Sequence, residues 1–346
     1  LVLIIGGLIT AYLALDLVAQ NFGTSGFFAG LSILHKEAPD HFDMILSPDN
    51  KFYNELPGLT VLVGGLWIAN LSYWGSNQYI TQRALGAKDL DTAQKGLLFA
   101  GFLKLMMPLI VVIPGIAAYV LHNVDPAFKA SMTVADVVKP DRAYSSLLDL
   151  LPTGLKGVAF AALVAAIVAS LAGKANSIAT IFTLDIFKKF MDKEASEDKL
   201  VRIGQVSILG SFIIAIMVAP ALTSLDQGFQ YIQEYTGFIT PGVCAIFLLG
   251  LFWKKATPTA ALTAALLTIP LSALMKSLTP MVPFLDRMGY VFLILVALMV
   301  LISYLKPESS KKEIVVDRSL FETSFGFRIG ALLIMGILAA LYIAYW

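Results

Sequence analysis

The sequence is poor in charge, cysteine and histidine, and each shortage excludes a class of protein. Charged residues make up 14% of the 346, against about a quarter in an ordinary soluble domain. The single cysteine, Cys244, excludes an internal disulfide and a cysteine-based metal cage. The histidines (His35, His41 and His122) lack the spacing of metal ligands. The net charge is only +1 and there is no basic tract, so the sequence offers no surface for a phosphate backbone.

Apolar residues are abundant, at 58% of the chain. A helix that crosses a bilayer needs about 20 mostly apolar residues. Eight segments, or nine with the shorter first one, meet this requirement: 1–18, 57–80, 97–121, 153–183, 202–222, 229–253, 259–277, 289–305 and 326–345. None alternates as a strand does, and lipid requires every backbone group to be satisfied internally. We therefore expect an all-α, polytopic membrane protein.

The distribution of Lys and Arg predicts the orientation of these segments. The basic residues concentrate in alternate connections, which should face the cytoplasm: 81–96, 184–202, 254–255 and 306–328. This places the long connection 19–56 outside, as a solvated lid or a short surface helix. The chain starts at Leu1 inside an apolar run, without the basic region or cleavage site of a signal peptide. We expect a fragment whose upstream part is missing.

Polar side chains inside a span are costly in lipid and are therefore candidates for function. In 57–80, Asn70, Tyr73 or Trp74, and Asn77 follow one helical face. An amide, a phenol and an indole suit a hydroxylated ligand such as a sugar. Equally, they suit a polar stripe that joins two helices.

The segment 229–253 carries acid and amide groups near its outer end, including Gln233 and Glu234. Such groups indicate either a water-filled cavity beside a discontinuous helix or a helix that begins later. Gly237 and Pro241 would permit a break.

Two further positions combine a structural and a functional interpretation. Small residues recur about every four positions in 153–183, which mainly lets helices approach closely. Ser170 lies on that face, and its hydroxyl could bind a hard cation such as sodium.

Lys104 lies about nine residues past Lys95, roughly 13 Å into the membrane at the rise of a helix. Its ammonium could return to the interface or donate to substrate hydroxyls.

Long stretches of the chain resemble the sodium/solute symporter family, in particular its bacterial sodium/galactose and animal sodium/glucose cotransporters. The resemblance covers nearly the whole chain. Its most specific motifs are GGLWIANLSYWGSNQYITQRALGAKD, FLKLMMPLIVVIPGIAAYV, GLKGVAFAALVAAIVASLAGKANSIATIFTLDIF and FQYIQEYTGFITPGVCAIFLLGLFWKK.

The resemblance implies an inverted-repeat fold of five plus five core helices, with substrate at the membrane midplane and alternating access. On this basis 1–18 is the end of the fifth core helix and 19–56 an external loop. Core helices six to ten, the second repeat, occupy 57–253, and three peripheral helices occupy 254–346. The first repeat would be absent from this chain.

The resemblance also implies roles for individual residues. It assigns substrate contacts to three core helices, at Asn70, Lys104 and Gln233. It assigns gates to aromatic side chains, at Tyr73, Trp74 and Phe229. The sodium ligands would be the Ala166 carbonyl and two successive hydroxyls, but the sequence reads Ala169-Ser170. With the first hydroxyl missing, water replaces it or the sodium site is weaker, and proton coupling or loose coupling becomes possible.

We therefore expect sodium-coupled uptake of a hexose such as galactose or glucose across the plasma membrane. The expected partners are the sugar, the sodium ion, membrane lipid and the missing N-terminal half of the protein. The alternatives are a symporter for another polyol such as inositol or for a small carboxylate, and a sugar-sensing module that does not transport. An enzyme is not expected, because the spans contain no constellation of His, Cys or carboxylate groups.

Overall fold

The computed structural model describes residues 2–54, 58–222, 228–307 and 321–346. Leu1, residues 55–57 at the junction of the predicted loop and second span, and residues 308–320 of the predicted peripheral region lie outside the described residues. The chain forms two compact units. The first unit comprises Leu1–Phe42 and Ala100–Gly228, and the second comprises Asp43–Phe99 and Phe229–Trp346.

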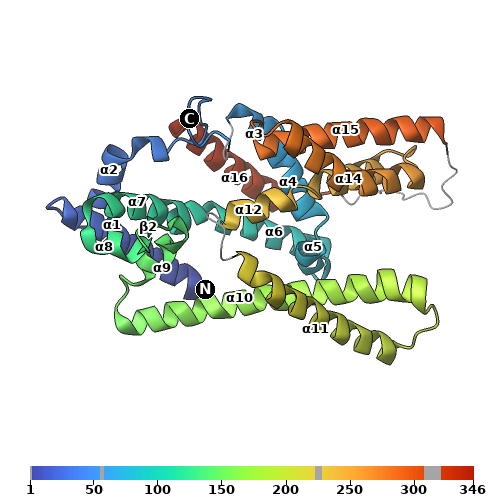
Figure 1. The fold of residues 1–346 in the computed structure, drawn as a ribbon, viewed down its shortest axis with the longest axis horizontal. Coiled ribbons are helices and arrows are strands. Elements are labelled where there is room, and N and C mark those ends of the chain that lie inside the picture. The colour runs from blue at the N-terminus through green and yellow to red at the C-terminus, as the bar shows by residue number, and fades with distance from the viewer. Residues whose placement is uncertain (1, 55–57, 223–227, 308–320) are drawn as a thin grey trace. The chain divides into compact units, whose positions relative to one another are not determined.

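In the described residues helices occupy each predicted span, and breaks interrupt the helices of 57–80 and 229–253 (Figure 1). Seven of the described helices are long and apolar enough to cross a membrane, and Leu59–Gly75 and Thr240–Phe252 are shorter apolar helices. The predicted all-α membrane class is confirmed. The described structure also contains one small hairpin that the sequence did not predict, in which β1 (Thr133–Val134) pairs with β2 (Val137–Val138).

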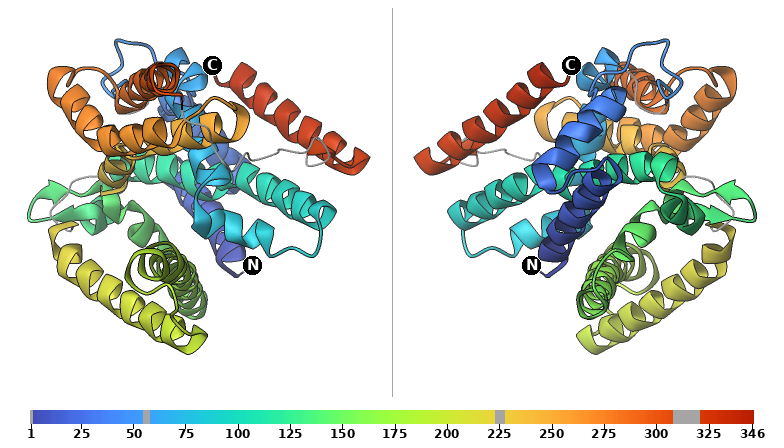
Figure 2. Two further views of the ribbon diagram at one scale, coloured as in Figure 1. Left: turned by 90° about the vertical axis from the view of Figure 1, so that its right-hand side faces the viewer. Right: turned by 90° about the vertical axis from the view of Figure 1, so that its left-hand side faces the viewer.

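The first unit is built around α1 (Val2–Asn21), α2 (Phe27–Glu37) and α7 (Ile113–Val124). Its core contains Leu15, Leu34 and Leu121, which are fully buried. The shorter elements of this unit are η1 (Pro39–His41), the π-helical η2 (Pro108–Val112), α8 (Pro126–Met132), η3 (Pro140–Arg142) and α9 (Ala143–Leu148). Beyond them, α10 (Thr153–Thr180) continues into the π-helical η4 (Ile181–Met191), and α11 (Glu197–Leu222) runs beside α10 (Figures 1 and 2).

The predicted connection 19–56 contains the helix α2, which packs on α1. Gly30 is buried at the crossing, where an added β-carbon would overlap the Leu15 carbonyl oxygen. Asp16, which sequence reasoning did not single out, accepts a 2.6 Å hydrogen bond from the Gly26 backbone N–H just before α2 begins. The close backbone approach at Gly30 and the hydrogen-bonded turn at Gly26 make α2 part of the packed core of the first unit.

The second unit contains the remaining helices. They are α3 (Leu59–Val63), α4 (Gly65–Gly75), α5 (Gln78–Leu85), α12 (Gly228–Thr236), α13 (Thr240–Phe252), α14 (Pro258–Leu278), α15 (Phe284–Leu305) and α16 (Phe325–Ala344). The helix α6 (Leu90–Leu105) begins in this unit and ends in the first. The helices α13, α14 and α15 share a core of small and branched side chains, including Ala245, Ala264 and Leu295. Small side chains allow this close contact, which replaces the hydrophobic effect as the source of stability in lipid.

The predicted span 57–80 is not one helix. It breaks at Gly64 and again after Gly75, where Ser76 ends α4. Asn77 then caps α5, because its side-chain oxygen accepts from the Tyr79 N–H at 3.1 Å. The prediction that Asn77 continues the polar face of Asn70 is wrong, since a capping residue lies outside the helix that it was expected to extend.

Candidate functional site

The predicted break in the span 229–253 is present in the second unit. The helix α12 ends at Thr236 and α13 begins at Thr240, so residues 237–239 form a hinge between two half-helices. Pro241 lies in the first turn of α13, where its missing N–H costs no hydrogen bond. The structure therefore contains a break at the position that Gly237 and Pro241 predicted.

Hydroxyl groups from α14 satisfy the backbone at this hinge. The Phe238 carbonyl accepts hydrogen bonds from Thr268 Oγ1 and from Ser272 Oγ, both at 3.1 Å. Thr268 Oγ1 also accepts from the Gly242 N–H at 3.1 Å. Unpaired backbone groups at membrane depth cost several kcal/mol, roughly 2 to 7 on transfer scales. These two side chains thus remove the main penalty of interrupting a helix there.

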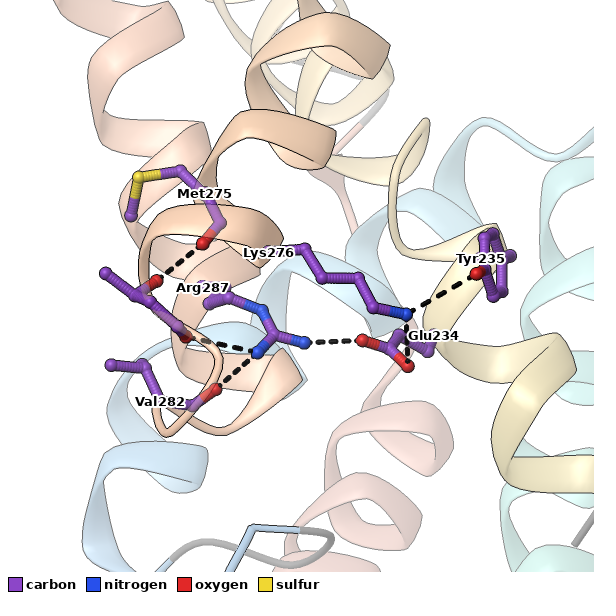
Figure 3. Close-up of polar contacts among 7 residues, drawn as sticks. Glu234, Tyr235, Met275, Lys276, Val282 and Arg287 are labelled. Atoms are coloured by element: carbon purple, nitrogen blue, oxygen red, sulfur yellow. Dashed lines mark hydrogen bonds and ion pairs between the residues drawn. The ribbon is translucent and has the colours of Figure 1, made fainter.

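A cluster of charges lies beside the same hinge (Figure 3). A Glu234 carboxylate oxygen on α12 is 2.5 Å from an Arg287 guanidinium nitrogen on α15, and the other oxygen is 3.2 Å from Lys276 Nζ on α14. The Arg287 guanidinium also donates to the Val282 carbonyl at 2.7 Å. Only 10% of the Arg287 side chain and 21% of the Glu234 side chain are exposed. We call Glu234, Lys276 and Arg287 the Glu234 cluster.

Sequence reasoning identified Glu234 but missed its partners. Lys276 and Arg287 are not among the site residues that the sequence predicts. The available signal was the acid itself, because a carboxylate inside a span requires a cation or a wet cavity nearby. A small cavity of about 20 Å³, the size of one water molecule, lies between Glu234, Ser272 and Arg287.

The predicted substrate and gate residues of the second unit lie on α4 and α12. Asn70 is half-buried on α4, and its amide nitrogen donates to the Leu66 carbonyl of the same helix at 2.9 Å. Gln233 and Phe229 are exposed on α12, Phe229 to 74%. The helix α4 packs against α13 and α15, so α4 and the second half-helix belong to one packed body.

The predicted gate residues Tyr73 and Trp74 contact each other. Their rings meet edge to face, with centroids 5.5 Å apart. Both side chains are exposed, at 44% and 38%. An exposed pair of large aromatic rings can close over the apolar face of a ligand, as a gate requires.

The remaining predicted site residues lie in the first unit. Lys104 is exposed near the end of α6. On α10, Ala166 and Ser170 are half-buried and Ala169 is exposed. The convergence of Asn70, Lys104 and Gln233 on one cavity stays a prediction, and so does the sodium site on α10.

The sequence pattern of the sodium:solute symporter family matches residues 1–268 of this chain. The chain belongs to the sodium:solute symporter family. It is 46% identical over 355 aligned residues to a sodium/glucose cotransporter of Vibrio parahaemolyticus, covering 99% of this chain and 64% of that protein. It is 36% identical over 211 residues to a sodium/myo-inositol cotransporter 2 of Bos taurus, covering 59% of this chain and 31% of that protein. The chain therefore spans less than two thirds of the length of these relatives.

A solved structure shows the same fold. The chain resembles a Na⁺-coupled sialic acid symporter in a substrate-bound, outward-open state, with a TM-score of 0.69 and 18% identity. The likeness covers 90% of this chain and 61% of the symporter. The family and the helices together identify a multi-pass membrane protein of a transporter family, as the sequence motifs predicted.

Proposed function

We propose that the protein to which this chain belongs takes up a hexose by sodium-coupled symport across the cell membrane, and that it is not an enzyme. The observation that carries this proposal is the broken helix α12–α13, held open by side chains from α14. Discontinuous helices at midplane are where secondary transporters bind substrate and ions, because polar groups near the break then face a cavity.

In this proposal the Gln233 and Asn70 amides donate to and accept from sugar hydroxyls, and the Lys104 ammonium donates to them. Their amide and ammonium groups offer both kinds of hydrogen-bonding partner, as a polyol requires. Tyr73, with Trp74 beside it, and Phe229 close the two sides of the site. The exposure of Tyr73 and Phe229 is consistent with rings that gain contacts only on closure.

The driving ion in this proposal is sodium, bound by the Ala166 carbonyl and the Ser170 hydroxyl. Each sodium ion that enters gains roughly 2.3 kcal/mol per 100 mV of inward potential. Sodium and sugar should strengthen each other's binding by the same factor, since the coupling free energy is reciprocal. The N-terminal half of the protein and the surrounding lipid complete the carrier.

The test is sugar uptake into proteoliposomes by the complete protein, with and without a sodium gradient, over a panel of hexoses, myo-inositol and small carboxylates. Accumulation of galactose or glucose only under an inward sodium gradient supports the proposal. A preference for myo-inositol would support the same mechanism with a different substrate. This outcome is included because the bovine relative is named a sodium/myo-inositol cotransporter. Binding of sugar without uptake would instead support a sensing module.

A further inference from the structure

The helix α14, predicted to be peripheral, contacts the hinge along one of its faces. Thr268, Ser272 and Lys276 follow one another at intervals of four residues and therefore lie on the same side of the helix. Thr268 and Ser272 bond the Phe238 carbonyl, and Lys276 bonds the Glu234 carboxylate one turn away. We call Thr268, Ser272 and Lys276 the α14 brace.

The brace contacts both half-helices. On the α13 side, a β-carbon added at Gly242 would lie 2.6 Å from the β-carbon of Thr268, so the two helices meet with almost no intervening side chain. On the α12 side, Lys276 contacts Glu234 at 3.2 Å and lies 4.6 Å from the centre of the Tyr235 ring. Arg287 holds the same carboxylate from α15. The first half-helix is thus held at its last turn by polar contacts and the second by close packing.

We propose that the α14 brace and the Glu234 cluster set the orientation of α12, and so act as positioning residues for Gln233 and Phe229. This inference rests on the proposed function, because those two side chains are the proposed substrate contact and gate on α12. Without these contacts, α12 would be joined to α13 through residues 237–239 alone and would sample several directions relative to it. Its substrate-binding orientation would then be one among several.

The consequence for transport follows from population arithmetic. If only a fraction of carriers holds α12 in the competent orientation, the apparent dissociation constant for sugar equals the intrinsic constant divided by that fraction. Loss of one hydroxyl contact, with a net value typical of a hydrogen bond, corresponds to about a fivefold change in such an equilibrium. Weakening the brace therefore raises the KM for sugar, by up to about fivefold when the competent orientation is the minor one, and leaves the maximal rate per carrier unchanged.

The variants that test this are Thr268→Val and Ser272→Ala, made in the complete protein. Thr268→Ser keeps the hydroxyl and should restore wild-type behaviour. The matched control is Thr263→Val on the same helix, because the Thr263 hydroxyl bonds only the Thr259 carbonyl among the contacts described for it. Ser272→Ala is the milder change, since the Phe238 carbonyl keeps its bond from Thr268, and it remains informative if Thr268→Val folds poorly.

Two measurements decide the proposal. The backbone amides of residues 234–240 and of Gly242 should exchange hydrogen faster, by up to about fivefold, in Thr268→Val and Ser272→Ala, and not in Thr263→Val or Thr268→Ser. Sugar uptake should show a raised KM in the same two variants. A lower maximal rate with unchanged KM and unchanged exchange would overturn the positioning role, as would equal effects from Thr263→Val. If the wild-type protein shows no sodium-driven sugar uptake, the proposed function fails, while the exchange measurement still decides whether α14 holds the hinge.

Discussion

Glu234 on α12 and Arg287 on α15 form an ion pair of 2.5 Å, with the arginine nearly enclosed by its surroundings. They lie 53 positions apart in the sequence. Lys276 shares the same carboxylate, so one acid neutralises part of the charge of two cations from two other helices. The Glu234 cluster therefore links α12, α14 and α15 near the C-terminal end of α12.

Removing the carboxylate charge should destabilise the second unit. In Glu234→Gln the enclosed Arg287 loses its anionic partner, and we expect a loss of about 1–3 kcal/mol, between the values for exposed and buried pairs. Thermal unfolding of the complete protein in detergent measures this loss. Asp286→Asn on α15 is the matched control, because Asp286 is a half-buried acid that accepts from the Thr60 hydroxyl, outside the cluster. An equal effect from both variants would contradict a special role for Glu234.

The contact between α4 and α15 should not tolerate a methyl group at Gly65. An added β-carbon would overlap the Leu285 carbonyl oxygen, so the helices would have to separate. Gly65→Ala should cost about 1–3 kcal/mol of stability, the usual effect of overpacking. Gly75 on the same helix has open space around it, and Gly75→Ala is the control. If both variants unfold at the same temperature, this close approach is not present in the protein.

The proposed substrate contacts can be tested by truncation. Lys104→Ala or Gln233→Ala in the complete protein should abolish concentrative sugar uptake while membrane insertion and yield stay normal. Lys95→Ala is a suitable control on α6, because Lys95 forms only an exposed pair with Asp91 among its described contacts, and such pairs contribute little. Normal uptake by both test variants would refute the assignment.

The proposed sodium site predicts opposite effects at two neighbouring positions. Ala169→Ser supplies the hydroxyl that the family resemblance leads us to expect, and it should lower the sodium concentration for half-maximal uptake. Ser170→Ala should raise it, each by about fivefold for a contact of hydrogen-bond strength. The measurement is uptake against sodium concentration at fixed membrane potential. Unchanged sodium dependence, with uptake that instead follows a proton gradient, would show that these residues do not bind the driving ion.

The helices and the break at the hinge could be predicted because their causes are local. Runs of about 20 apolar residues have few alternatives to a spanning helix. Gly237 and Pro241 also stand four residues apart inside one such run, which indicates an interruption. Gly64 and Gly75 lie where the segment 57–80 breaks, although that segment was predicted as one span.

The contacts that hold the hinge could not be predicted, because they depend on tertiary structure. Thr268 and Ser272 are hydroxyl residues in an apolar span, and such residues usually bond the carbonyl four positions earlier on their own helix. Ser177 and Thr180 on α10 do so here. Only the position of α14 against residues 237–239 distinguishes the two cases.

The one cysteine of this chain has a practical consequence for labelling experiments that would follow the orientation of α12. Cys244 is 2% exposed in the core shared by α3, α4, α13 and α15, and its neighbours there include Ile68 and Met288. A thiol reagent should reach it slowly. A cysteine introduced on the exposed face of α12, for example by Ile232→Cys, would react first and could carry a fluorophore or spin label without removal of the native thiol.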